Sequence, residues 1–384
     1  MAASPSTARA INDRLALRLL QDEGPLTATQ LKTLTGLSRP TVADLVERLS
    51  GSGLVHVVGE AGAERRGPNA RLYGIVADRA HLAALDVRTT SVSVVVSDLL
   101  GTTLAEASLP VGDGAAPGPA VDRAAPGPAV DRAVALLERT AAEAGAARLH
   151  SVTVGAPGLI DPATRELRDT AALPEWHRRL VAALQQRLPA TVLVENEVNL
   201  AAVAELREGA AREGRDTFVL LWLGQGVGAA VVLDGRLRRG ASGGAGEIGF
   251  LPVPGTFRLP SAHGCDGGFD ELACVAAVDA LARAHGLDPD TALESGHEPF
   301  LDALAERLAI GAASVAAVLD PGCVVLAGET GHRGGPELAA RVEARLAELS
   351  PLRTEVRATT LGDAAILRGA LLTARDAAQD ALFP

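Results

Sequence analysis

The segment Phe218–Phe250, FVLLWLGQGVGAAVVLDGRLRRGASGGAGEIGF, constrains the fold of this chain more than any other stretch. Two apolar runs, Phe218–Leu223 and Ala229–Leu233, lie on either side of a glycine-rich turn, Gly224–Gly228. The second run ends in Asp234–Gly235, a pair that is typical of tight hairpin turns. The segment therefore predicts a strand, a glycine turn and a second strand closed by a hairpin.

A second glycine segment, Gly240–Gly249, follows the hairpin and contains one carboxylate, that of Glu247. Clustered glycines either make a tight turn or let backbone N–H groups approach an anion closely. The two glycine segments at this spacing resemble the signature of the ROK family (repressors, open reading frames and sugar kinases). The resemblance implies an α/β fold with a two-lobed, actin-like (ribonuclease H-like) sugar-kinase body, in which Glu247 contacts the sugar.

The N-terminal segment carries local signals for helices separated by short turns. Thr27–Gln30 has the pattern of a capping box and predicts a helix to about Leu34. Ser38 is a natural N-cap for the next helix, with Pro40 in its first turn. This third helix buries one face at helical spacing: Val42, Leu45, Val46 and Leu49. Its other face carries Arg39, Thr41, Asp44 and Arg48.

A strand over 54–58, a polar loop over 59–69 and a returning strand over 71–76 complete a winged helix-turn-helix, which we place at 8–76. The phrase LTGLSRPTVADLVERLSGSGLV resembles the recognition unit of ROK-family repressors. Ser38, Arg39 and Thr41 are the expected phosphate and base contacts, and Arg65 and Arg66 on the wing the expected backbone or minor-groove contacts. The alternative is a helical packing module without DNA.

Charge is distributed in a way that suits a DNA-binding head on an acidic body. The net charge is −11, yet residues 1–80 hold ten Lys and Arg against eight Asp and Glu. The N-terminus lacks the apolar core of a signal peptide, and no apolar run reaches the length of a membrane helix. We expect a cytoplasmic protein with reduced thiols and no membrane partner.

The body, expected over 80–384, begins with three short strands at 81–87, 91–98 and 102–110. In sugar kinases of the resembled family, the first turn reads Asp-x-Gly-x-Thr, and its glycine leaves room for the ATP phosphates. Here the turn reads Asp86-Val-Arg88-Thr89-Thr90, so Arg88 stands in place of that glycine. The simplest interpretation is a lost nucleotide site.

Between these strands and the next lies a tandem repeat, AAPGPAVDR at 115–123 and 124–132. So dense in proline and glycine, the first copy is expected to form a surface loop, with a helix over about 128–142. The first lobe is expected over about 80–195 together with the C-terminal helix, and the second over about 196–360.

Two further segments match the sugar side of the family. Gly155-Ala-Pro-Gly158 resembles the loop that lies over the sugar, and Glu195-Asn196-Glu197 resembles the Glu-Asn-Asp motif that opens a helix. The resemblance assigns Asn196 to sugar contact and places Glu197 at the catalytic base. The additional methylene of Glu197 displaces its carboxylate, and proton abstraction is sensitive to such a displacement. Glu195 and Glu197 can equally be helix N-terminal charges.

The family's zinc motif is altered in this sequence. Phe250 occupies the histidine position, and of the cysteine positions only one retains a candidate ligand, His263. Cys265 and Cys274 are out of register, although a rearranged site with His263 is conceivable. Closed structural zinc sites need four ligands, so we expect no zinc and no other cofactor. Asp270 stands where the family has its last sugar-contacting glutamate.

The last part of the chain is expected to contain a helix over about 299–318, a strand leading to a glycine loop at 327–329, and a final helix opened by Leu361-Gly362-Asp363. Both features resemble elements that ROK kinases and repressors share.

Three functions are compatible with these patterns. The first is a transcriptional regulator, most simply a repressor of carbohydrate metabolism, that binds a double-stranded operator as a homodimer or homotetramer. In this regulator a sugar effector binds in a catalytically inactive cleft, where it contacts Gly158, Asn196, Glu197, Glu247 and Asp270. The second is an active sugar kinase with a DNA-binding head, against which Arg88, Thr89 and Glu197 argue. The third is a regulator whose body only mediates oligomerisation.

Overall fold

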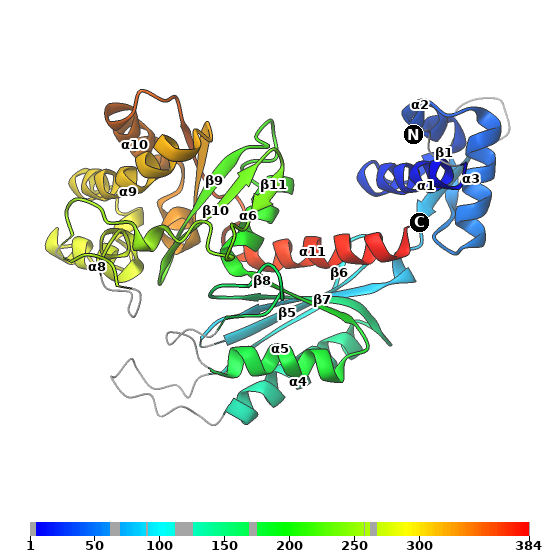
Figure 1. Cartoon of the computed structure of the whole chain (residues 1–384), viewed down its shortest axis with the longest axis horizontal. Helices are drawn as coiled ribbons and strands as arrows, with labels where there is room; N and C mark the ends of the chain where they lie inside the picture. Colours follow the sequence, from blue (N-terminus) through cyan, green and yellow to red (C-terminus); the bar gives the residue numbers. More distant parts are fainter. Residues whose placement is uncertain are drawn as a thin grey trace.

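The computed structural model describes residues 5–61, 70–89, 91–111, 126–168, 175–256, 258–261 and 267–383. Over these residues the strands form three sheets, of three, five and five strands. The small sheet belongs to a helical module at one end of the molecule, and each larger sheet forms the centre of one lobe (Figure 1). None of the helices in these ranges is long and apolar enough to span a membrane.

The N-terminal module is a winged helix-turn-helix. Its elements are α1 (Pro5–Asp22), β1 (Leu26–Thr27), α2 (Ala28–Thr35), α3 (Arg39–Gly51), β2 (Val55–Ala61) and β3 (Ala70–Ile75), with sheet order β1-β3-β2. The predicted capping box is present, because the backbone N–H groups of Thr27 and Gln30 each bond the other residue's side chain, at 2.9 and 3.2 Å. The strand β2 continues through Ala61, where we expected loop, because it pairs with β3 as far as Ala70.

The first lobe is built on a mixed sheet of order β6-β5-β4-β7-β8. Its strands are β4 (His81–Val87), β5 (Ser91–Asp98), β6 (Thr103–Pro110), β7 (Leu149–Ala156) and β8 (Thr191–Asn196). Helices α4 (Pro126–Glu143) and α5 (Glu175–Arg187) cover one face, and α11 (Ala365–Leu382) lies on the other (Figure 1). The helix α4 begins at Pro126, inside the second copy of the tandem repeat, earlier than predicted; the first copy lies outside the described residues.

The second lobe contains a sheet of order β11-β10-β9-β12-β13. Its strands are β9 (Phe218–Leu223), β10 (Val227–Leu233), β11 (Arg236–Arg238), β12 (Cys323–Ala327) and β13 (Glu355–Ala358), and its helices are α7 (Asp270–Ala273), α8 (Val275–Ala284), α9 (Glu298–Leu319) and α10 (Gly328–Leu349). The predicted hairpin at Asp234–Gly235 is confirmed, with φ angles of 54° and 68°. The predicted glycine loop at 327–329 is wrong, because α10 begins directly at Gly328.

Two helices, α6 (Glu197–Arg207) and α11, share one apolar core with both large sheets. This core includes Ala84 of the first sheet and Phe218, Leu220 and Val325 of the second. The short 3-10 turns are η1 (Ala77–Arg79), η2 (Ile248–Phe250), η3 (Ala292–Glu294) and η4 (Gly362–Ala364). Because η4 leads into α11, the predicted opening of the last helix at Leu361–Asp363 is confirmed.

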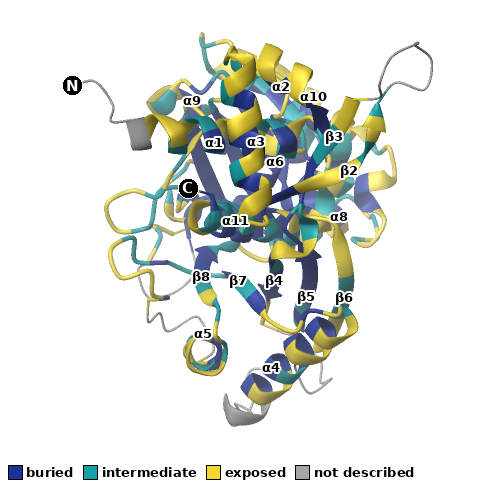
Figure 2. Ribbon diagram, turned by 90° about the vertical axis from the view of Figure 1, so that its right-hand side faces the viewer, coloured by how far each residue is buried: buried dark blue, intermediate teal, exposed yellow. Residues whose placement is uncertain are grey.

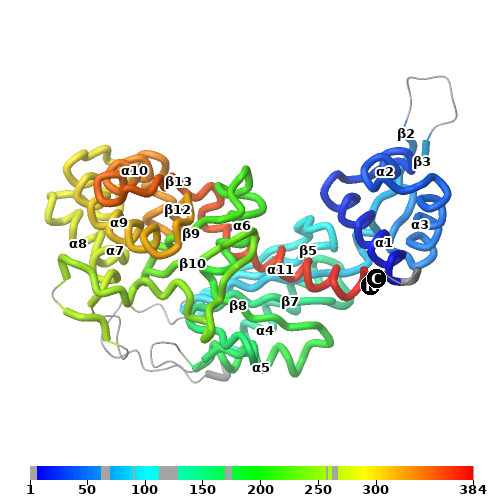
Figure 3. The backbone as a smooth tube through the Cα atoms, turned by 45° about the horizontal axis from the view of Figure 1, so that its top comes forward, coloured from blue at the N-terminus to red at the C-terminus, as the bar shows by residue number. Residues whose placement is uncertain are grey.

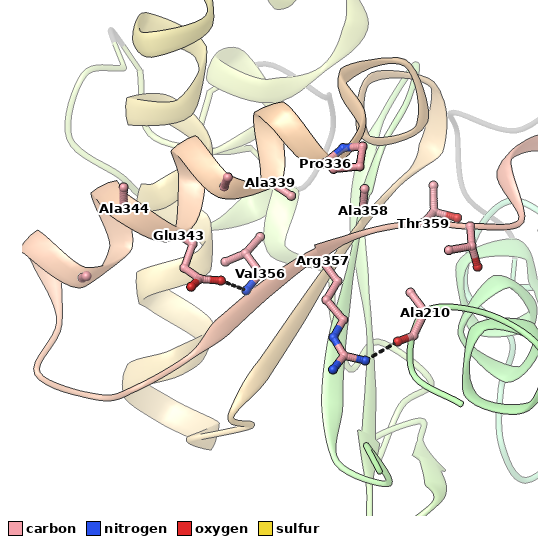
Figure 4. A pocket seen from close by; sticks show the side chains of 12 residues that line it. Ala210, Pro336, Ala339, Glu343, Ala344, Val356, Arg357, Ala358 and Thr359 are labelled. Atoms are coloured by element: carbon pink, nitrogen blue, oxygen red, sulfur yellow. Dashed lines mark hydrogen bonds between the residues drawn. The ribbon is translucent and has the colours of Figure 1, made fainter. Parts of the chain in front are cut away.

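The edge strand β13 is partly covered by side chains of neighbouring elements. Its Val356 N–H donates to Glu343 Oε2 of α10 at 2.7 Å, and Arg357 Nη1 donates to the Ala210 carbonyl at 2.6 Å (Figure 4). A groove of about 650 Å³ lies between α10 and this strand. None of its lining residues belongs to the predicted ligand-binding set.

Candidate functional site

The start of α3 presents the residues predicted to contact DNA. Ser38 Oγ accepts a hydrogen bond from the Thr41 N–H at 3.3 Å and lies 2.8 Å from Thr41 Oγ1, so the two hydroxyl groups fix the first turn. Arg39 is exposed and forms no ion pair with any residue in the described ranges. Figure 2 shows α3 in front, with much of its outer surface exposed. Arg65 and Arg66 lie outside the described residues.

Arg48 does not lie on the free face of α3 as expected. Its guanidinium donates to both carboxylate oxygens of Asp13 in α1, at 2.5 and 3.3 Å, and it also pairs with Asp44. The Asp13 side chain is only 8% exposed, so this ion pair lies at the boundary between the two helices. The role of Arg48 is to hold α3 against α1, and no spacing rule could reveal it because the partner is 35 residues away.

The head is packed on the body through the end of α11. Arg14 of α1 forms an ion pair with Asp380 at 2.8 Å, and Gln379 donates to the side chain of Gln21 at 3.0 Å. The head core continues into body residues, which include Leu82, Leu99, Ala374, Ala378 and Phe383. Figure 3 shows α11 running from the lobes to the head. The head is therefore docked on the body as well as joined to it by the chain.

Two of the predicted ligand residues are tied to each other. Asn196 Nδ2 donates to the Gly158 carbonyl at 3.0 Å, while Asn196 Oδ1 accepts from the N–H groups of Val198 and Asn199 at 2.9 and 3.2 Å. Asn196 is thus the N-cap of α6, the use that β-region backbone before a helix favours. This bond holds the loop after β7 against the start of α6.

Glu195 is a part of this arrangement whose contacts the sequence did not reveal. Its carboxylate is buried, and it accepts from Arg239 at 2.6 to 2.7 Å and from Asn199 Nδ2 at 2.9 Å. Arg239 lies immediately before the glycine segment of the second lobe, so the ion pair connects the two lobes. The only hint of this ion pair in the sequence was the position of Arg239 next to Gly240.

The glycine segment itself lies against the first lobe. A Cβ built on Gly243, whose φ is 84°, would be 2.0 Å from the Ile160 carbonyl oxygen, so only glycine fits there. Glu247 follows at the end of this segment; the residue is exposed, and partial desolvation of its carboxyl raises the pKa above the ordinary value. The segment thus brings Glu247 close to the loop that contains Gly158, since a Cβ built on Gly244 would be 3.5 Å from Leu159 and 3.6 Å from Glu247.

Asp270, the last predicted ligand residue, has a structural partner. Its Oδ1 accepts from the Val227 N–H at 2.9 Å and so anchors the start of β10 to α7. Burial raises the pKa of this carboxyl, and the Val227 N–H opposes the shift. Phe250, in the same region, is 44% exposed.

Four charged residues influence one another near the end of β4. We call them the carboxylate cluster: Asp86, Arg88, Glu197 at the start of α6, and Asp363 in η4. Arg88 Nε donates to Asp86 Oδ2 at 2.9 Å, and Asp86 is 4% exposed. Glu197 is half-buried, and its pKa is raised to about 7, first by burial and then by the negative charge of Asp86. Asp363 adds negative charge near both Asp86 and Arg88.

His177 lies beside the backbone of Arg88 and was not anticipated. It is 1% exposed and packs edge-on against Trp176 with ring centroids 4.3 Å apart. Burial lowers its pKa to about 4, so the imidazole is neutral at neutral pH.

Comparison with known proteins identifies the family of the body. The ROK family description matches residues 83–377, which is most of the chain, and a winged helix-turn-helix DNA-binding description matches residues 9–56. The chain belongs to the ROK family. The relatives that are similar to it include an enzyme and a transcriptional regulator.

The bifunctional enzyme NanE/NanK of Brucella melitensis is 35% identical over 229 residues, which are 54% of this chain and 39% of that protein. The DNA-binding transcriptional dual regulator NagC of Escherichia coli K12 is 25% identical over 280 residues, 71% of this chain and 64% of NagC. The chain thus spans less than two thirds of the length of these relatives.

A solved structure extends the likeness to the complete arrangement. The crystal structure of a ROK family transcriptional regulator, described as a homologue of the E. coli MLC protein, superposes with a TM-score of 0.76 over 98% of both chains at 19% identity. At this identity the likeness concerns the fold: a winged helix-turn-helix followed by the actin-like ROK body.

The residues around Phe250 do not fit the zinc site that the ROK family implies. Phe250 offers no ligand atom, and burial raises the pKa of the Cys274 thiol, which disfavours the thiolate that zinc requires. His263 and Cys265 lie outside the described residues. Within the ranges that the structure describes, no three potential ligands come together.

Proposed function

We propose that this ROK protein is a DNA-binding transcriptional regulator whose body binds a sugar or sugar derivative and thereby controls the head. The observation that carries the proposal is the docking of a winged helix-turn-helix, with the start of α3 exposed, on a sugar-kinase fold. The names of NagC and of the MLC homologue support the regulatory role.

The head, over residues 8–76, would enter the major groove with the start of α3. Arg39 is the free cation of this turn, while Ser38 and Thr41 would donate to phosphates once DNA displaces their mutual hydrogen bond. Arg65 and Arg66 would contact the DNA from the wing. A homodimer or homotetramer would present two heads to an inverted repeat.

The sugar would bind between the loop of Gly158 and the start of α6 on one side and the glycine segment on the other, within a body over residues 80–384. Glu247 and Glu197 offer carboxylates to hydroxyl groups. Asn196 and Asp270 already hold backbone groups, so their contribution would be to shape the site and to rearrange when ligand enters. The Glu195–Arg239 ion pair between the lobes would respond to any change in their separation.

The helix α11 offers a route from that site to the head. Asp363, a member of the carboxylate cluster, precedes its first turn, and Asp380 in its last turn holds Arg14 of α1. Asp13, the next residue of α1, holds Arg48 of α3. An effector that moves the start of α11 or α6 would therefore change the position of α3, provided that it binds the two positions with different affinity.

The residues around Arg88 argue against a kinase. Arg88 stands where the ROK kinases have glycine, and the charges of Asp86, Glu197 and Asp363 act on it, so ATP phosphates would meet both a side chain and negative charge. The 35% identity to NanE/NanK keeps an active sugar kinase as the alternative candidate.

The test is to select operator sequences with the purified full-length protein from a random DNA library and to measure binding by fluorescence anisotropy, with and without a panel of free sugars. Specific binding that changes with one sugar supports the regulator. Binding that no sugar changes supports a body used only for oligomerisation. ATP consumption with a sugar, measured in the same preparation, would instead support the kinase.

A further inference from the structure

One ion pair joins the two lobes beside the residues that the sequence assigned to the sugar. Glu195 lies near the end of β8 in the first lobe, and Arg239 follows β11 in the second. Arg239 Nε and Nη2 donate to Glu195 Oε2 at 2.7 and 2.6 Å. Because two short, charge-assisted bonds converge on one oxygen atom, the pair is sensitive to a small change in the separation of the lobes.

The two partners differ in how firmly they are held. Glu195 is fixed at the start of α6, because its Oε1 accepts from Asn199 Nδ2 at 2.9 Å and from the Asn196 N–H at 3.1 Å. Its side chain is 7% exposed, whereas that of Arg239 is 39% exposed. Separation of the lobes would therefore move Arg239 into water. It would leave a buried carboxylate without the one cation that pairs with it among the described residues, which is unfavourable.

The glycine segment that follows Arg239 belongs to the second lobe and touches the first. The Ala229 N–H donates to the Gly246 carbonyl at 2.7 Å and so ties the segment to β10. In the middle of the segment, Gly243 lies directly against the Ile160 carbonyl oxygen of the first lobe. The ion pair and this close contact therefore both depend on the same arrangement of the lobes, which we call the closed arrangement.

We propose that Glu195 and Arg239 form a clasp that holds the lobes in the closed arrangement, and that both are positioning residues for the effector. Gly158 and Asn196 lie on the first-lobe side of the clasp, and Glu247 lies on the second-lobe side. An effector that contacts both sides binds the closed arrangement, so the clasp reduces the ordering that binding itself must impose. This inference rests on the proposed sensor function and specifies how the affinity of its site is set.

The first measurement tests the clasp without a ligand. Hydrogen exchange of the full-length protein, followed by mass spectrometry, reports how often the segments over 158–162 and 240–246 open. Arg239→Gln removes the cation, so we expect their amides to exchange at least about tenfold faster, while those of β9 and β12 keep their rates. The matched control is Arg238→Gln, which removes the adjacent arginine. That arginine lies 3.7 Å from Asp234 in an exposed turn, and its loss should change neither set of rates.

The second measurement tests the positioning role with uncharged sugars. The probes are glucose, mannose, xylose and N-acetylglucosamine, and isothermal titration calorimetry gives their affinities. We expect at least one of them to bind the parent, and to bind Arg239→Gln about tenfold more weakly. Arg239→Lys keeps the charge but not the two-donor geometry, so it should recover part of the lost affinity.

Salt distinguishes the clasp from a merely structural role of Arg239. The guanidinium is partly exposed, so salt weakens the ion pair, whereas an uncharged sugar carries no charge of its own to screen. The affinity of the parent should therefore fall about two- to threefold between about 0.05 and 1 M sodium chloride, and that of Arg239→Gln should not. Exchange of the two segments in the parent should rise over the same range, which tests the clasp without any substitution.

Three outcomes overturn the inference. If exchange is the same in the parent and in Arg239→Gln, and does not rise with salt in the parent, the clasp is refuted while the proposed sensor function stands. Faster exchange with unchanged sugar affinity refutes the positioning role. If no probe binds the parent, the positioning role and the proposed sensor function both fail, whereas the exchange rates still decide whether the clasp exists. Thermal unfolding of each variant checks that it folds.

Discussion

Gly369 of α11 lies directly against the carbonyl oxygen of Leu200 in α6, so closely that a Cβ on Gly369 would be 1.9 Å from that oxygen. The two helices shared by the lobes therefore meet backbone to backbone. Because α6 carries Glu197 at its first position and α11 ends at the head, this contact lies between the proposed ligand site and the DNA-binding module.

Gly369→Ala is expected to lower the free energy of unfolding by about 1–3 kcal/mol, because the added methyl group forces the two helices apart. Urea unfolding followed by circular dichroism measures the change. Gly51→Ala is the matched control: Gly51 ends α3 and a Cβ there meets nothing within 4 Å. Equal stability of the two variants would contradict the close packing.

Arg39→Ala is expected to abolish detectable operator binding at moderate salt, because Arg39 is exposed in the first turn of α3 and forms no ion pair with any residue that the structure describes. A residual affinity should show a shallower salt dependence, by about one unit of slope for each lost phosphate contact. Fluorescence anisotropy measures both quantities. Arg353→Ala, an exposed arginine of the body, is the control and should bind DNA as the parent does.

The Asp13–Arg48 pair should matter more to stability than its neighbour Arg14–Asp380. Asp13 is nearly buried, so Asp13→Ala removes the contact that holds Arg48 against α1, although Asp44 still pairs with the guanidinium, and it should cost about 1–3 kcal/mol. The Asp380 side chain is 71% exposed, and Asp380→Ala should cost less than about 1 kcal/mol. Thermal unfolding of the two variants and of the double mutants gives each coupling energy, and similar values for the two pairs would refute this ranking.

Glu197 should make the protein less stable as the pH rises from about 4.5 to 7. Its pKa is raised to about 7 in the folded state, so the folded protein binds the additional proton in this range and loses that advantage at higher pH. Glu197→Gln removes the titrating group. The free energy of unfolding of the variant minus that of the parent should therefore be roughly 1–3 kcal/mol higher at pH 8 than at pH 4.5. A parallel pH dependence of the parent and the variant would refute the shifted pKa.

His177 should have the opposite effect in an overlapping range. Burial lowers its pKa to about 4, so the unfolded chain takes up the proton first and stability falls as the pH decreases from about 6.5 to 4. His177→Phe should flatten this decrease, as denaturant midpoints at a series of pH values would measure. An unchanged acid limb would mean that other groups control it.

The sequence predicted those features whose causes are local. The capping box at Thr27 and the N-cap at Ser38 lie within three residues of their partners, and the hairpin at Asp234–Gly235 needs only two positive φ angles. The resemblance to the ROK family signature then predicted the two-lobed fold of the body. Such features depend on neighbouring residues, so a reading along the chain can find them.

The contacts that connect the parts of the molecule could not be predicted in this way. Arg48 to Asp13, Arg239 to Glu195 and Arg14 to Asp380 join residues that are 35, 44 and 366 positions apart. Asp270 illustrates the same limit, because its bond to the Val227 N–H depends on how α7 packs beside β10. Only the folded structure brings these partners together.

The hydrogen bond between Glu343 and the Val356 N–H also bears on the behaviour of the protein at high concentration. The strand β13 is the last of its sheet, and an unpaired edge is where a strand from another molecule can add and start an aggregate. A carboxylate from α10 occupies one outward N–H group of that edge, and its charge repels an incoming apolar strand. The side chain of Glu343 thus both joins α10 to β13 and opposes the pairing of β13 with a strand of another molecule.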